Sequence, residues 1–448
     1  MPNKIYDIMG IGYGPANISL HICLKENESN NRYRAKFFER RDSFCWHGGM
    51  LMPDTYLQVS FLKDLVTQRN PRSRYTYINF LHETGRLTKF INIRQFEPTR
   101  LEFNEYLKWV VDQEELTPDV QYSSTVKLVT PNVRDGVVHS LNVEIANTQS
   151  GQTEVFTTRN LSVATGGKPI LPKMNRPDPR VTHCGSFLES IERLKNEKNE
   201  RLRFAVVGGG QSSVEMILYL YNNFPNAEIC AIISGFAFQQ ADSSVFVNEV
   251  FMNEHVDSYF FGNPDVKEEL FQKKTNYAVV SQDDLEVLYK ILYKQSFFGQ
   301  KRIHFNNFTK VQQIDATDRS ITLHLRDRKT GNTTTENFDQ VFLGTGFNRG
   351  ELECMKPLND YLSLMKPDEK GNIEYEVNRD YSVKTTASFQ PKVYIQGHSE
   401  NQHGLTNSLL SVCAVRADEI RESLVENLLK FKTEPVAESN GSLTAVQP

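Results

Sequence analysis

The sequence lacks the marks of several protein classes. No apolar run approaches the roughly 20 residues that span a bilayer, and the first residues show no signal-peptide pattern. The formal net charge of −4 gives no electrostatic reason to bind nucleic acid or an anionic membrane. We therefore expect a cytoplasmic protein whose partners include neither nucleic acid nor a membrane.

Cysteine is scarce and scattered. No C-x-x-C pair occurs, which argues against a redox dithiol, a disulfide reductase and a zinc site. We interpret the cysteines as reduced and mostly packing residues, and we expect no bound metal. The six are Cys23, Cys45, Cys184, Cys230, Cys354 and Cys413.

The chain instead has length and one pattern that occurs twice. At 448 residues it is two or three times as long as a typical domain. A short apolar run, a glycine-rich turn, a helical pattern and a second apolar run follow one another over residues 5–39 and again over 204–233. Strands ending in Thr-Gly, at Thr165 and Thr345, close the two units. The pattern predicts an α/β fold with two Rossmann-like dinucleotide-binding domains.

The first glycine turn fits a pyrophosphate site. Gly12 permits the tight bend and Gly14 lets the backbone approach a phosphate, while Pro15 opens the helix whose N-terminus supplies donors. Asn17 stands where a third glycine is usual and adds an amide donor. Glu39, at the end of the second strand, is placed to accept hydrogen bonds from a ribose. A glycine turn without a ligand is the alternative.

The second turn has the same form. Gly208 and Gly210 follow an apolar run, and the residues that open the next helix are small or polar, so they can cap it and bind phosphate. These residues are Gln211, Ser212 and Ser213. The following strand ends at Ser234, with neither the acid that favours NADH nor the arginine that favours NADPH. The missing acid favours NADPH, although no basic residue stands out as a 2′-phosphate ligand, and a turn without a nucleotide stays open.

Further motifs connect the two turns. They are W-H at 46–47, Q-V-S-F-L-K-D-L at 58–65, R-N-P at 69–71, R-L-E-F at 100–103, F-V-N-E at 246–249, T-N-Y at 275–277, G-T-G-F at 344–347 and H-G-L at 403–405. With them the chain resembles the flavin-dependent N-hydroxylating monooxygenases of siderophore biosynthesis, the L-ornithine N5- and L-lysine N6-monooxygenase family. The resemblance extends from Gly10 to about Leu424, and the block at 58–65 is its most specific part.

The resemblance implies FAD, NADPH and O2, with a small primary amine as substrate. In this family the reduced flavin and oxygen form a C4a-hydroperoxide, and a neutral amine attacks its distal oxygen to give a hydroxylamine. Retained NADP+ would shield that species from water. A free alkylammonium has a pKa near about 10.4, and desolvation in the pocket would lower it. Because the family tends to form tetramers, the resemblance also implies a homo-oligomer.

The resemblance implies a domain plan. We expect a discontinuous FAD-binding domain over 1–170 and 340–432, and an NADPH-binding domain over 171–235 and 300–339. A smaller, mainly helical substrate region covers 236–299. We expect the polar, breaker-rich residues 433–448 to form a disordered tail.

Site residues follow from matching positions. Gln58 and Asn276 are the expected catalytic pair, and Lys63, Asn248 and Asn276 the substrate ligands, with Lys63 facing a substrate carboxylate. The cofactor-binding residues are expected to be Gly12, Gly14, Pro15, Asn17, Glu39, Trp46, His47, Gln58, Arg100, Gly208, Gly210, Gln211, Ser212, Ser213, Asn276, Thr345, Gly346 and Leu405. A core position for Trp46, a surface charge at Lys63 or a capping role for Asn248 are the alternatives.

One departure leaves the substrate open. The family usually shows His-Gly-Leu-Ser-Asp near its end, whereas this chain has Thr406 and Asn407 after Leu405. Lys63 and Asn248 favour an α-amino acid such as ornithine. Putrescine, cadaverine, histamine and lysine remain alternatives.

Two other functions are alternatives. A Baeyer–Villiger or flavin-containing monooxygenase would carry Phe-x-Gly-x-x-x-His, and the residues before His183 lack that Phe and Gly. A non-catalytic nucleotide-binding flavoprotein would have lost Gln58, Lys63 and Asn276, and all three are present.

Overall fold

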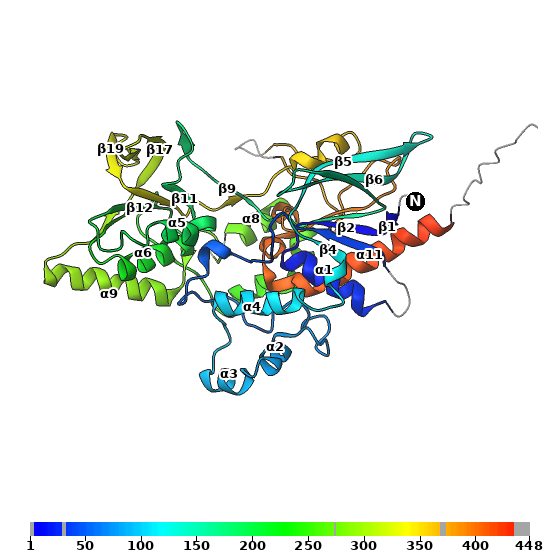
Figure 1. Cartoon of the computed structure of the whole chain (residues 1–448), viewed down its shortest axis with the longest axis horizontal. Coiled ribbons are helices and arrows are strands. Elements are labelled where there is room, and N and C mark those ends of the chain that lie inside the picture. The colour runs from blue at the N-terminus through cyan, green and yellow to red at the C-terminus, as the bar shows by residue number, and fades with distance from the viewer. Residues whose placement is uncertain (1–3, 29–32, 273–274, 368–372, 434–448) are drawn as a thin grey trace, which may run out of the picture.

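The computed structural model describes residues 4–28, 33–272, 275–367 and 373–433. Figure 1 shows two lobes side by side, one containing β12, α6 and α9 and the other β2, α1 and α11. Each lobe has a five-stranded parallel sheet, which confirms the predicted α/β class with two Rossmann-like units. The tail expected to be disordered lies, from residue 434 onward, outside the described residues.

The first lobe has the sheet order β22-β8-β2-β3-β4. Alternate residues of the central strand face opposite layers: Ile8 packs with the helices, and Met9 packs with an antiparallel sheet. The parallel strands are β2 (Ile8–Ile11), β3 (Ala35–Phe38), β4 (Val120–Gln121), β8 (Leu161–Val163) and β22 (Val393–Ile395). The covering elements are α1 (Pro15–Glu26), α11 (Cys413–Thr433), β1 (Ile5–Tyr6), β5 (Ser124–Arg134), β6 (Val137–Asn147) and β7 (Thr153–Thr158).

The second lobe repeats this plan in the order β11-β20-β12-β13-β16. Its parallel strands are β11 (Val181–His183), β12 (Arg203–Val207), β13 (Glu228–Ile232), β16 (Ile303–Asn306) and β20 (Gln340–Leu343). The helices are α5 (Phe187–Arg193), α6 (Gln211–Asn223) and α9 (Gln282–Phe298). The second layer is the antiparallel sheet β17 (Thr309–Ala316), β18 (Ile321–Asp327) and β19 (Thr333–Phe338), to which β10 (Lys173–Met174) adds in parallel.

The boundary expected at residue 340 is too early. Strand β20 pairs with β11 and β12, so it belongs to the second sheet. The chain crosses between the lobes after Gly166 and again after Gly346, both with positive φ (67° and 80°). The two crossing segments form a short ribbon, β9 (Lys168–Pro169) against β21 (Phe347–Asn348). The two Thr-Gly exits therefore mark the passages between lobes.

Short helices fill the segments between these units. Between β3 and β4 the chain forms α4 (Arg100–Val111) as well as α2 (Tyr77–Glu83) and α3 (Leu87–Ile93), which project below the first lobe (Figure 1). The Thr76 hydroxyl caps α2 by accepting a hydrogen bond from Asn79 N at 3.2 Å. Residues 236–299 are mainly helical, with β14 (Gln239–Gln240), η4 (Val247–Phe251), α7 (Glu254–Phe260), α8 (Pro264–Gln272), β15 (Val279–Val280) and α9.

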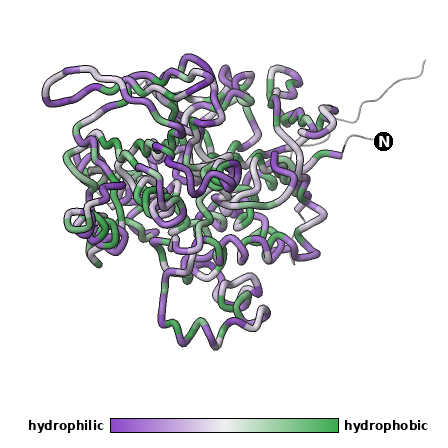
Figure 2. The backbone as a smooth tube through the Cα atoms, turned by 60° about the vertical axis from the view of Figure 1, so that its left-hand side comes forward, coloured by the Kyte–Doolittle hydropathy of each residue, from purple (hydrophilic) through white to green (hydrophobic). Residues whose placement is uncertain are grey.

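Hydrophobic stretches are short everywhere. Figure 2 shows hydrophilic residues interrupting the hydrophobic ones through both lobes. In the part of the chain that the structure describes, no helix combines the length and apolar character needed to cross a membrane.

Candidate active site at the two glycine turns

The first turn leaves open space where a phosphate would lie. Gly12 has a φ of +80°, and a Cβ there would lie 2.5 Å from the Ala164 carbonyl oxygen at the exit of β8. A Cβ on Gly14 would meet nothing within 4 Å. Pro15 then begins α1 at the position that suits proline. Gly12 is thus required by a backbone contact, and Gly14 leaves the helix N-terminus accessible.

Asn17 stabilises this turn through hydrogen bonds within the protein. Its side chain is buried; Nδ2 donates to the Gly12 carbonyl at 2.7 Å, and Oδ1 accepts from Ser162 Oγ at 2.7 Å and from Gln396 Nε2 at 3.1 Å. The amide expected to bind cofactor is therefore used within the protein. It joins the turn to β8 and to the chain after β22, because the third turn position lies where helix and strands pack.

Glu39 is fixed beside the same turn. Its carboxylate accepts hydrogen bonds from Tyr13 N and Arg41 N, each at 3.0 Å. The side chain is only half-buried, so the other lone pairs can accept from a ribose.

Buried polar atoms gather after β22, at the carboxyl edge of the first sheet. Among the described residues, no hydrogen-bond partner is found for Gln396 Oε1, His398 Nδ1, Asn407 Nδ2 and Arg416 Nε. Buried groups of this kind are normally paired. Together with the open space at Gly14, they fit a cofactor with a polar ring edge and a pyrophosphate, such as FAD.

The second turn is held by similar contacts. Gly208 has a φ of +136°, and a Cβ there would lie 2.3 Å from the Gly344 carbonyl oxygen. A Cβ on Gly344 would in turn lie 2.2 Å from Ser213 Oγ, so Gly344 makes room for the serine at the third turn position. Gly209 faces open space. Ser213 is fully buried, which gives it a packing place like that of Asn17.

Gln211 ties the second turn to the helical region. Its Oε1 accepts from Ser281 N at 2.8 Å, and its Nε2 donates to Glu215 at 2.9 Å and to Asp284 at 2.6 Å. Ser212, half-buried beside it, lies within hydrogen-bonding reach of the Cys184 thiol, whose pKa burial raises to about 11. The side chains expected at the nucleotide thus also fix the start of α9.

Arg100 reaches the other lobe. Its guanidinium donates to both Glu215 oxygens, at 2.9 and 2.6 Å, and to the Met50 carbonyl at 3.2 Å. The Arg100 and Glu215 side chains are only 14% and 3% exposed. Met50 and Met52 pack in the core of the second lobe. The residue expected to line the FAD site therefore bridges the two lobes.

We expect Arg100→Ala to lower the free energy of unfolding by about 3–5 kcal/mol, because it leaves the buried Glu215 carboxylate unpaired. Urea unfolding measures the change. The double variant with Glu215→Ala should lose less than the sum of the single variants. An unchanged urea midpoint for Arg100→Ala would show that the pair does not hold the lobes.

Trp46 and His47 lie at the same interface. The Trp46 ring packs on Phe103 and on His47, with centroids 5.5 and 4.4 Å apart. His47 adopts a left-handed conformation, and its side chain is exposed. The surrounding protein, with nearby Arg100 and Arg41, lowers the pKa of His47. The imidazole is therefore neutral at pH 7.

Gln58 and Lys63 are available for a ligand. Gln58 is exposed and makes no hydrogen bond to the described residues. Lys63 is half-buried, and burial alone lowers its pKa, since no described carboxylate pairs with it. The neighbouring Asp64 is buried and accepts hydrogen bonds from Val66 N at 2.9 Å and Tyr77 N at 2.8 Å. Asp64, for which the sequence indicated no role, thus shapes the segment that presents Lys63.

Asn248 and Asn276 lie near other parts of the site. Asn248 donates from Nδ2 to the Ser243 carbonyl at 3.0 Å, and its helix η4 packs against η6 (Leu405–Ser408), which contains the buried Leu405. Asn276 is half-buried, and the loop that carries it covers the second turn: a Cβ on Gly210 would lie 3.6 Å from Ala278 Cα. No hydrogen bond connects Lys63 to either asparagine within the described residues.

A cluster that the sequence did not indicate joins this loop to the C-terminal segment. The Tyr277 hydroxyl donates to Glu400 Oε1 at 2.5 Å, and Arg349 NH1 lies 3.3 Å from the same oxygen. Tyr277 is 44% exposed, and its partial burial together with the Glu400 carboxylate raises its pKa. Thr345, also expected at the cofactor, donates from Oγ1 to the Ile170 carbonyl at the crossing between lobes. Glu400 belongs to no motif, so only the fold reveals the cluster.

The burial of His403 makes the stability of the protein depend on pH. His403 is 1% exposed, stacks on Tyr381 and lies 3.1 Å from the Arg379 carbonyl through Nε2. Burial, with nearby Arg379 and Arg416, lowers its pKa to about 3. The unfolded chain, with a His pKa near 6.5, therefore binds one proton more than the folded chain between pH 6.5 and about 3.

Stability should consequently fall as the pH is lowered through that window, by about 1.4 kcal/mol per pH unit for this residue. His403→Gln keeps a donor for the carbonyl but does not titrate. Urea unfolding between pH 4.5 and 6 should show a shallower pH slope in the variant, by one proton. Equal slopes would contradict a neutral buried imidazole.

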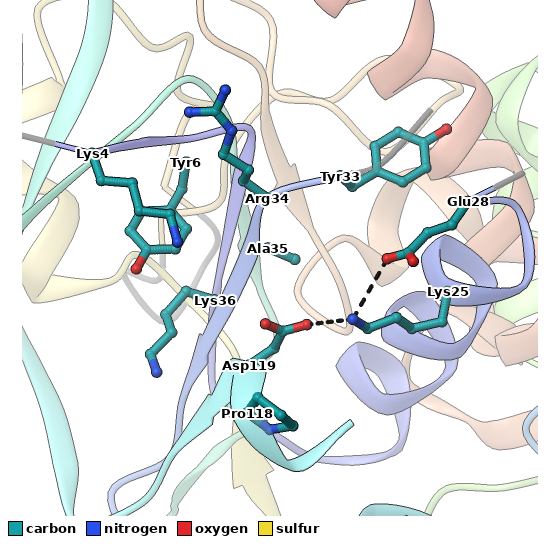
Figure 3. Close-up of a pocket in the computed structure, with 10 residues that line it drawn as sticks. All are labelled: Lys4, Tyr6, Lys25, Glu28, Tyr33, Arg34, Ala35, Lys36, Pro118 and Asp119. Atoms are coloured by element: carbon teal, nitrogen blue, oxygen red, sulfur yellow. Dashed lines mark ion pairs between the residues drawn. The ribbon is translucent and has the colours of Figure 1, made fainter. Parts of the chain in front are cut away.

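A separate cavity of about 520 Å³ lies away from both turns. Figure 3 shows Lys25 between the carboxylates of Asp119 and Glu28, at 2.8 and 3.5 Å, on one side of this cavity. Its walls come from the end of α1, from β1, from β3 with the residues before it, and from Pro118 and Asp119, all in the first lobe.

Comparisons with known proteins show the family of the chain. Residues 4–349 match the family described as L-lysine 6-monooxygenase/L-ornithine 5-monooxygenase. The chain is similar to the L-ornithine N(5)-monooxygenase of Pseudomonas aeruginosa (36% identity, 95% of this chain and 94% of the relative) and to that of Burkholderia cepacia (38%, 94% and 94%). The solved Kutzneria ornithine N-hydroxylase with reduced FAD, NADP+ and L-ornithine superimposes with a TM-score of 0.88 at 33% identity, over 95% of this chain and 100% of that one.

Proposed function

Since the chain belongs to the L-lysine 6-monooxygenase/L-ornithine 5-monooxygenase family and is therefore a monooxygenase, we propose that it hydroxylates the side-chain amine of L-ornithine. The relatives at 36% and 38% identity are named for that reaction. The proposal includes FAD at the first turn and NADPH at the second. Both turns fit these groups, because Gly14 and Gly209 border open space at helix N-termini.

The substrate assignment rests on the environment of Lys63. Its half-buried ammonium has no described carboxylate partner, and an unpaired buried charge is costly. The carboxylate of a bound amino acid would supply the missing partner, whereas putrescine, cadaverine and histamine have none. Asn248 keeps its amide oxygen free to accept from the α-ammonium group, since Nδ2 is bound to Ser243.

The remaining residues of the proposed site would orient the substrate and exclude water from it. FAD held at the first turn would supply the redox chemistry that activates O2, with electrons from NADPH. The loop carrying Asn276 covers the second turn and would exclude water from the nicotinamide side. The amine must lose its proton to act as a nucleophile, and the desolvation that lowers the pKa of Lys63 would act on it too.

A panel of ornithine, lysine, putrescine, cadaverine and histamine tests the proposal. Each is incubated with the FAD-loaded protein and NADPH, and hydroxylamine is measured, because NADPH loss alone also reports peroxide release. We expect the highest product kcat/KM with ornithine. Product from a diamine but not from ornithine would overturn the substrate assignment, and hydroxylamine from none of the amines would overturn the reaction.

A further inference from the structure

We propose that Arg328, together with Ser234, binds the 2′-phosphate of the coenzyme and so selects NADPH over NADH. The inference rests on the proposed use of a nicotinamide coenzyme at the second turn. It assigns the ligand that the end of β13 lacks in sequence, where neither an acid nor an arginine follows the strand.

The first lobe indicates where that ligand must lie. There the strand that follows the turn and helix, β3, is followed directly by Glu39, which is fixed beside the turn at Tyr13 N. In the second lobe the corresponding strand is β13, and it runs parallel to β12 with Val207 opposite Ile232. The chain just beyond Ile232 therefore occupies the place of Glu39, which is where an adenosine ribose meets its ligand in such units. The residue equivalent to Glu39 is the buried Ile233, and Ser234 is the first exposed residue beyond it.

Arg328 reaches this place from another element. Its NH1 donates to the Ser234 carbonyl at 2.6 Å, across 94 residues of sequence. Two backbone hydrogen bonds fix the segment that carries Arg328. Arg328 N donates to the Phe308 carbonyl at 2.7 Å, and Phe308 N donates to the Gly235 carbonyl at 2.8 Å. Strands β16 and β17 meet at this point, and β18 ends there. The guanidinium is therefore positioned by three chain segments at the carboxyl edge of the sheet.

The arginine retains donors for an anion. Its side chain is exposed, one hydrogen bond is made, and no described carboxylate forms an ion pair with it. Asp327, the acid next to it in the sequence, accepts hydrogen bonds within its own turn, from Lys329 N at 2.6 Å and Thr330 N at 3.1 Å to Oδ1. The exposed Ser234 hydroxyl makes no bond to the described residues and can donate beside it.

This donor set discriminates between the coenzymes. A ribose 2′-hydroxyl is best held by a carboxylate, which would repel a 2′-phosphate. A guanidinium instead binds phosphate through parallel N–H donors. With Arg328 and Ser234 at the edge where an acid is absent, a phosphate gains contacts that a hydroxyl cannot make.

Calorimetric titration of the FAD-loaded protein with 2′,5′-ADP and with 5′-AMP tests the assignment without turnover. Arg328→Ala should weaken 2′,5′-ADP at least about tenfold, the change of roughly 1.4 kcal/mol that one charge-assisted contact represents, and leave 5′-AMP unchanged. Arg319→Ala is the matched control, because it removes the same charge from the turn at the opposite end of β17 and β18. It should bind both probes as the wild type does.

The outcomes separate the two proposals. Unchanged 2′,5′-ADP affinity in Arg328→Ala would overturn the assignment, and equal weakening of both probes would show that Arg328 only shapes the loop. In the same variant the ratio of kcat/KM for NADPH to that for NADH should fall about tenfold or more. Absence of amine hydroxylation in the wild type would refute the proposed function while leaving the binding result intact.

Discussion

Lys63→Ala should raise the KM for L-ornithine about 30-fold or more, because the variant leaves the substrate carboxylate unpaired in a partly buried place, a loss of roughly 2–5 kcal/mol. Steady-state formation of hydroxyornithine measures the change. Lys89→Ala, which removes an exposed lysine from α3, is the control and should keep the wild-type KM. Since Lys63 pairs with no described acid, the substitution should not lower thermal stability.

The same variant separates an amino acid from a diamine. Putrescine has no carboxylate, so whatever turnover it shows should be the same in Lys63→Ala and in the wild type. Wild-type ornithine kinetics in Lys63→Ala would contradict the carboxylate assignment. Equal losses for ornithine and putrescine would point to a different role for the lysine.

The second large effect is expected from Gly12→Ala. The left-handed backbone alone costs an L-residue about 1–2 kcal/mol, and the new Cβ would also lie 2.5 Å from the Ala164 carbonyl oxygen. We expect protein that is insoluble or that has lost about tenfold or more of its FAD affinity. Flavin absorbance against protein concentration gives the occupancy.

Gly14→Ala is the matched variant in the same turn. Its φ of −89° suits any residue, and a Cβ would meet no protein atom within 4 Å. The variant should fold with wild-type stability and lose FAD affinity only through contact with the pyrophosphate. If Gly12→Ala and Gly14→Ala retain FAD equally well, the first turn is not the flavin site.

Local signals in the sequence were enough to predict the architecture. Glycines between apolar runs of the right length predicted both parallel units, and the structure confirms them. The motifs at 58–65 and 246–249 predicted the family, which the comparisons confirm and which decides against the Baeyer–Villiger and non-catalytic alternatives. The sequence did not predict which sheet contains β20, because a short buried strand has the same apolar pattern in either sheet.

Long-range pairing could not be read from the sequence. Arg100 and Glu215 are 115 residues apart, and neither residue type indicates the other as its partner. Asn17 and Ser213 stood at turn positions that suggested ligand contact, yet their burial depends on strands that close the sheets much later in the chain. The lack of a carboxylate partner for Lys63 likewise becomes visible only when its neighbours in space are known.

The proposed reaction transfers one oxygen atom from O2 to ornithine, and mass spectrometry of the product formed under ¹⁸O2 detects that transfer. With FAD and NADPH we expect N5-hydroxyornithine carrying one ¹⁸O atom, in near-equal amount to the NADPH consumed. NADPH consumption that yields only hydrogen peroxide, or a hydroxylamine without the label, would contradict it.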